Sequence, residues 1–101
     1  MLVRVTVDSV EVLEPEVLTA LSVRAEIAEV DAFVALSQDG LGIRFEPGLV
    51  WLDVAGLARR AAVDQDAGWP ERYAAMIGYA ASQGWTADGD SIVRAHLEVA
   101  S

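Results

Sequence analysis

The sequence predicts a single α+β domain with a two-layer sandwich architecture. Its 101 residues are the length of one ordinary domain. Several segments alternate apolar and polar residues with the period of a half-buried strand, while others repeat apolar residues at helical spacing between proline and glycine breaks. We therefore expect residues 1–101 to form a sheet of about four strands, antiparallel or mixed, with two or three helices on one face.

The first strand is predicted over residues 2–7, where three valines alternate with polar side chains. After Asp8 and Ser9 the apolar phase changes, because Val10 and Val12 are the next apolar positions. A change of one residue moves the buried side chains of a strand to its opposite face. We expect a bulge, a bend or a turn at this point.

The segment 16–37 supports two interpretations. The composition, rich in alanine, glutamate and leucine, favours a helix that starts at Pro15 and covers 16–31, with an extension to 37. A helical stripe is formed by Val23, Ile27, Val30 and Val34. The same segment also alternates like a strand, at Leu21, Val23, Ala25 and Ile27. A further alternative is a hairpin that pairs 33–37 with 41–46.

The middle of the chain predicts a strand, a turn and a buried strand. Residues 41–46 alternate, with Leu41, Ile43 and Phe45 as the apolar set. Pro47-Gly48 is typical of a type II turn, although a wider loop suits a hairpin better. The apolar run 49–52 then indicates a buried strand.

Two helices are expected in the second half. Asp53 is a capping residue for a helix over 54–66. A second helix begins at Pro70, ends at Gln83 and is closed by Gly84 in a left-handed conformation. Its buried stripe consists of Tyr73, Ile77, Ala80 and Ala81. Trp85 follows the cap and is expected to fold back onto this stripe.

The last strand is predicted over Ser91–Val99, after a turn at 88–90. Its apolar side chains, at every second position from Val93, point to one face. Arg94, His96 and Glu98 point to the other face.

Composition and charge exclude several classes of protein. The net charge is -9, with 16 acidic and 7 basic residues, and this argues against nucleic-acid binding. Without cysteine the chain has no disulfide or thiol nucleophile, and its single histidine rules out a two-histidine metal motif. No metal or cofactor is therefore expected. Neither a signal peptide nor an 18-residue apolar run occurs, so we expect no membrane segment and a cytoplasmic protein.

The best candidate site is the row formed by Arg94, His96 and Glu98. Histidine titrates near neutral pH, and arginine can hold a carboxylate or phosphate with two hydrogen bonds. These groups suit acid–base chemistry on a small anionic molecule, with Glu98 or Tyr79 as a helper. The alternative interpretation is an ordinary solvated sheet face, which shows the same alternation.

Other polar side chains share the phase of this row. Arg4 and Thr6 occupy the polar phase of the first strand, and Arg44 and Glu46 occupy that of the strand at 41–46. If these strands belong to one sheet, at least three arginines and the only histidine meet on its open face. That face would be solvent-exposed, a dimer interface or the floor of a ligand site.

Two further groups of side chains are candidate sites. Trp69 and Tyr73 are one helical turn apart and would wall a pocket for a flat ligand, or else belong to the core. Asp88 and Asp90 have too few neighbouring ligands for a calcium site, so a turn is the better interpretation.

Three classes of function remain compatible with the sequence. The first is a small binding or accessory module, homodimeric because 53% of its residues are hydrophobic. The second is a cofactor-independent enzyme, an isomerase, cyclase or lyase, with His96 as acid or base and Arg94 as anion clamp. The third is an acidic inhibitor or immunity-type protein that binds a basic protein partner through its net charge.

Overall fold

A computed structural model describes residues 1–100 of the protein. Its single sheet has seven strands, six of them in the order β2-β1-β3-β7-β5-β4, with β6 paired to β7 outside this path. The strand bounds are β1 Leu2–Val5, β2 Val10–Leu13, β3 Ser22–Ala25, β4 Gly42–Glu46, β5 Leu49–Asp53, β6 Thr86–Ala87 and β7 Ile92–Val99. The α+β class is confirmed, but the sheet is larger than the four strands expected from the alternating segments.

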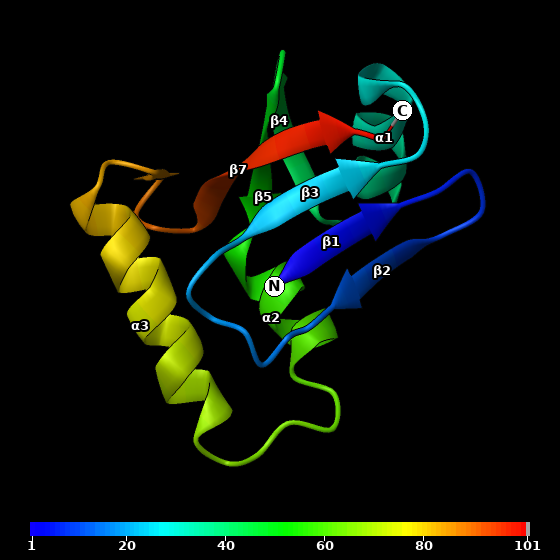
Figure 1. Cartoon of the computed structure of the whole chain (residues 1–101). Coiled ribbons are helices and arrows are strands. Elements are labelled where there is room, and N and C mark those ends of the chain that lie inside the picture. Colours follow the sequence, from blue (N-terminus) through cyan, green and yellow to red (C-terminus); the bar gives the residue numbers. More distant parts are fainter. Residues whose placement is uncertain (101) are drawn as a thin grey trace.

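The sheet is mixed because two short antiparallel units flank a parallel centre. β1 pairs with β2, and β4 with β5, as antiparallel hairpins. β1 and β3 are parallel, as are β3 and β7, whereas β5 runs antiparallel to β7. The central strand β7 pairs with three other strands, β3, β5 and β6, and lies beside β3 in Figure 1.

Three helices complete the fold: α1 Glu29–Gln38, α2 Val54–Ala61 and α3 Trp69–Ser82. Their buried side chains, such as Leu36, Leu57 and Ile77, join those of the sheet in one core cluster. The sheet contributes the side chains that the alternation predicted, including Val3 and Val93. The other face of the sheet carries polar side chains such as Arg24 and His96, and also the apolar ring of Trp51. The period of two in the strands thus gives the sheet one face that packs against the helices.

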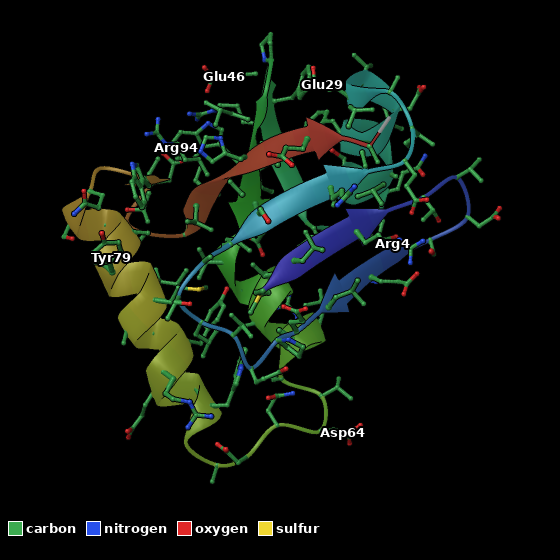
Figure 2. The ribbon with its side chains drawn as sticks, in the orientation of Figure 1. Arg4, Glu29, Glu46, Asp64, Tyr79 and Arg94 are labelled. Atoms are coloured by element: carbon green, nitrogen blue, oxygen red, sulfur yellow. The ribbon has the colours of Figure 1, made fainter. Side chains whose placement is uncertain are left out.

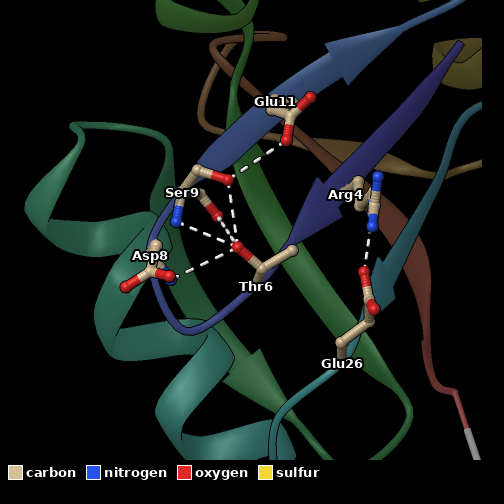
Figure 3. Close-up of polar contacts among 6 residues, drawn as sticks. All are labelled: Arg4, Thr6, Asp8, Ser9, Glu11 and Glu26. Atoms are coloured by element: carbon tan, nitrogen blue, oxygen red, sulfur yellow. Dashed lines mark hydrogen bonds and ion pairs between the residues drawn. The ribbon is translucent and has the colours of Figure 1, made fainter.

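The change of phase after the first strand is a hairpin turn. The backbone N–H of Thr6 donates to the carbonyl of Ser9 at 2.8 Å. The Thr6 hydroxyl accepts from the backbone N–H of Ser9 at 3.0 Å, a contact drawn in Figure 3. Val5 and Val10 are partners across this turn. The predicted turn at Asp8 and Ser9 is confirmed, with a second strand directly after it.

The expected helix over 16–31 is wrong up to residue 28, because α1 begins only at Glu29. Residues 22–25 form β3, and Glu16 to Leu21 lie in a connecting loop. Val23 and Ala25 have no exposed surface, because β3 lies between β1 and β7. Tertiary burial between two strands overrode the helix propensity of this segment, and the alternating pattern was the better signal.

The helix occurs later, as α1. It covers 29–38, so the alternative hairpin between 33–37 and 41–46 is also wrong. β4 pairs instead with β5 through the two residues Pro47 and Gly48, and Gly48 has the positive φ of 79° that such a tight connection requires. The strands at 41–46 and 49–52 are therefore confirmed, with a narrow turn.

The remaining elements agree closely with expectation. The Asp53 carboxylate accepts a hydrogen bond from the backbone N–H of Gly56 at 2.7 Å and caps α2, although α2 ends at Ala61 and not at 66. Gly84 follows α3 with a φ of 77°. The two-residue strand β6 was not predicted, since it is too short to show a period. No helix within residues 1–100 has the length and apolar character to cross a membrane.

Candidate functional site

The candidate site is built around β7, whose alternation is the one predicted. Val93, Ala95 and Leu97 are buried in the core, while Arg94, His96 and Glu98 are exposed on the open face of the sheet. The register aligns His96 with Leu49 of β5 on one side and with Ser22 of β3 on the other. Neither cross-strand partner of His96 is therefore a carboxylate.

The register also gathers the arginines on the open face. Trp51 pairs with Arg94 on one side and with Arg44 on the other, so these three side chains form one row across β7, β5 and β4. A second row contains Arg4, Arg24 and Glu98. Four of the seven arginines therefore lie on this face, as the shared phase indicated.

At the β1 end of the open face, Arg4 already forms an ion pair within the chain. The Arg4 guanidinium is 2.6 Å from a carboxylate oxygen of Glu26, as Figure 3 shows. This hydrogen bond and the charge of Glu26 raise the pKa of Arg4. Arg4 is thus a partner for a carboxylate of its own chain and lies apart from Arg94.

A break in the strand pairing opens a groove beside Arg94. β6 pairs with Ile92 and Val93, and β3 pairs with β7 only from His96 onward, on the same side of β7. Between them the backbone N–H of Arg94 donates to the carbonyl of Trp85 at 2.9 Å. On this side of β7, no strand within residues 1–100 pairs with Arg94. Side chains from α3 and from the loop before β3 border the open space instead.

Two adjoining cavities occupy this groove. The first, of about 300 Å³, lies between α3, the loop at 18–21 and β7. Its apolar wall includes Leu18, Met76 and Ile77. The second, of about 290 Å³, extends over the open face to Leu49 and His96. Both are lined by Leu21, Trp85 and Arg94, so the two cavities form one continuous groove with these residues in its middle.

Tyr79 and Trp85 form the aromatic part of the groove. Their ring centroids are 6.0 Å apart in an edge-to-face arrangement. Tyr79 is 61% exposed, and Figure 2 shows it on the same side of the molecule as Arg94. The groove thus offers an apolar wall at one end and a guanidinium with an imidazole at the other, which is the composition typical of a small-molecule site.

Trp69 and Tyr73 are not part of the groove. They are 2% and 6% exposed, and their rings stack with centroids 4.9 Å apart. The Trp69 indole N–H donates to the carbonyl of Pro15, and the Tyr73 hydroxyl donates to the carbonyl of Val54. Burial, and secondarily the charge of Asp53, raises the pKa of Tyr73. These two residues have the properties of core residues.

Several groove residues were absent from the sequence-based site. Leu21 and Met76 looked like ordinary apolar positions of a helix or strand, and only the fold brings them beside Arg94. Trp85 was expected to pack against α3, and its backbone N–H does donate to the carbonyl of Ala80. Within residues 1–100, no group of three or more histidine, cysteine, aspartate or glutamate side chains is arranged to hold a metal ion.

Comparisons with known proteins add no relative. No protein-family model matches the chain, and searches of curated proteins and of solved structures gave no significant match. The geometry of the groove is therefore the basis for assigning a function.

Proposed function

We propose that this protein is a small binding module that takes an organic anion with an apolar body into the groove beside Arg94. The single observation that carries the proposal is the pair of adjoining cavities that share Leu21, Trp85 and Arg94. An apolar body fits against Met76 and Ile77, while the Arg94 guanidinium binds the anionic group.

The charge of the molecule supports this choice of ligand. A net charge of -9 repels anions in general, so an anion binds only where positive groups are concentrated. Within residues 1–100 the ion pairs are Arg4–Glu26, Arg60–Asp39 and Arg72–Asp66. Arg94 is therefore available to a ligand, with the imidazole of His96 beside it in the second cavity.

The test uses 4-phenylbutyrate as the probe and 4-phenylbutanol as its uncharged analogue. We expect 4-phenylbutyrate to bind and to cause chemical-shift changes centred on Trp85 and Tyr79. Arg94→Gln should lower the affinity for this carboxylate about fivefold, because an exposed ion pair contributes about 1 kcal/mol. Arg59→Gln, an exposed arginine of α2, is the matched control. Equal binding of both probes, or equal affinity in both variants, contradicts the proposal.

An acid–base enzyme is the second candidate, favoured by the presence of His96 and Arg94 in one cavity. The same samples test it. Conversion of a bound anion by the wild type and its loss in His96→Ala would assign the activity. A ligand that stays chemically unchanged while bound leaves the binding module as the function.

We also propose that the module is a homodimer. Val30, Val34 and Ile43 are exposed apolar side chains of α1 and β4. α1 packs beside β4, and β4 is an edge strand of the sheet. A second copy that covers this area leaves the groove, on the opposite side of β7, open to ligand.

A further inference from the structure

We infer that the anionic group of the ligand is a phosphate monoester, held between Arg94 and Arg44 across Trp51. This inference rests on the proposed binding function and makes its ligand class specific. A phosphate monoester carries nearly two negative charges and three acceptor oxygens at neutral pH, so it can engage two arginines where a carboxylate engages one.

The first support is the row of side chains across three neighbouring strands. Arg94 of β7 pairs in register with Trp51 of β5, which pairs with Arg44 of β4. Neighbouring strands are about 4.8 Å apart, so the two arginine backbones are separated by about 10 Å. Long side chains on one face at this separation can converge on a single phosphate.

Trp51 gives the row a rigid centre. The Arg44 guanidinium carbon lies 5.5 Å from the centroid of the Trp51 ring, a cation–π distance. The indole N–H donates to a carboxylate oxygen of Glu46 at 3.0 Å. Trp51 is only 9% exposed, so it serves as a covered platform that positions Arg44.

The charges around the row favour an anion. Within the described residues 1–100, neither Arg44 nor Arg94 forms an ion pair, although both are exposed. The Glu46 carboxylate next to the row accepts the hydrogen bond of the Trp51 indole N–H. The His96 imidazole lies at the second cavity and offers a ring N–H as a hydrogen-bond donor. The remaining arginines Arg59, Arg60 and Arg72 belong to the helices, away from this face.

The size of the groove favours a small soluble ligand over a membrane surface. The apolar cavity that begins at Arg94 has about 300 Å³, the lower end of the range for small-molecule sites. An anionic membrane would in addition meet the overall charge of -9. The ligand is thus a small molecule with an apolar body in the groove and a phosphate above Trp51.

The test compares 4-phenylbutyl phosphate with 4-phenylbutyrate by calorimetry at constant ionic strength. We expect the phosphate to bind about fivefold more tightly, because a second exposed charge pair contributes about 1 kcal/mol. Arg44→Gln should remove this advantage and leave the affinity for the carboxylate unchanged. Arg59→Gln should change neither affinity.

The outcomes separate this inference from the proposed function. If both probes bind equally, or if Arg44→Gln weakens neither, the phosphate assignment is overturned while the groove remains a binding site. If neither probe binds, the proposed function itself fails. Because Arg44 is exposed, circular dichroism of Arg44→Gln should match the wild type, and a difference would mean that the loss reflects folding and counts against the assignment.

Discussion

The surroundings of Tyr73 show that it is a core residue and not part of a ligand wall. Its ring stacks on Trp69, and its hydroxyl donates to the carbonyl of Val54 at 2.7 Å. The spacing of one helical turn is compatible with a ligand wall and with a core pair. Burial distinguishes the two, because a side chain that is 6% exposed has no free surface for a ligand. The groove uses Tyr79 and Trp85 instead.

The Tyr73 hydroxyl gives a prediction about alkaline pH. Its folded-state pKa is raised above the unfolded value of about 10, so this group's contribution is fully present below pH 10 and is lost as pH rises further. We expect Tyr73→Phe to lower the free energy of unfolding by about 1 kcal/mol at neutral pH, through the lost hydrogen bond. Above pH 10 the variant should lose stability less steeply than the wild type.

Urea denaturation from pH 7 to 11 measures this difference. Tyr79→Phe is the matched control, because Tyr79 is a largely exposed tyrosine of the same helix. Parallel pH profiles for Tyr73→Phe and the wild type would show that Tyr73 is not the group responsible.

At the scale of elements, β3 shows how tertiary contacts override local preference. The segment from 16 to 31 is rich in good helix formers, yet residues 22–25 are extended. A strand between two parallel neighbours satisfies its backbone hydrogen bonds on both sides and buries Val23 completely. These gains exceed the small helix propensity of four residues.

Two valines test that account. We expect Val23→Ala to lower the free energy of unfolding by about 2 kcal/mol, because two buried methyl groups are lost from the centre of the sheet. Val63→Ala should change it by less than about 0.5 kcal/mol, since Val63 is 65% exposed and lies in the turn after α2. Chemical denaturation of both variants provides the measurement. Equal effects at the two positions would contradict the burial of β3.

At the scale of the whole molecule, charge and apolar surface are unevenly distributed. Four of the seven arginines lie on the open face, while the exposed apolar side chains Val30, Val34 and Ile43 lie on α1 and β4. The open face is rich in arginine, whereas the area on α1 and β4 is apolar. The two surfaces therefore suit different partners. We assign the arginine face to the ligand and the apolar area to a second copy.

The proposed dimer can be tested with one apolar-to-charged change. We expect the wild type to sediment as a dimer at high protein concentration and Val34→Asp to sediment as a monomer, because a carboxylate would be buried without a partner. Val63→Asp is the matched control, since Val63 is 65% exposed and lies in the turn after α2. A monomeric wild type, or dissociation by both changes, would contradict this assignment.

The sequence by itself determined the faces of the strands, several element boundaries and the polar character of Arg94, His96 and Glu98. These features depend on the period of two, on capping residues such as Asp53 and on glycine at positive φ, all of which are local. The tertiary structure alone decided that 22–25 is a strand and that Arg94 lies beside Trp85, Leu21 and Trp51. Such neighbours depend on register and on packing between distant segments, which local patterns do not specify.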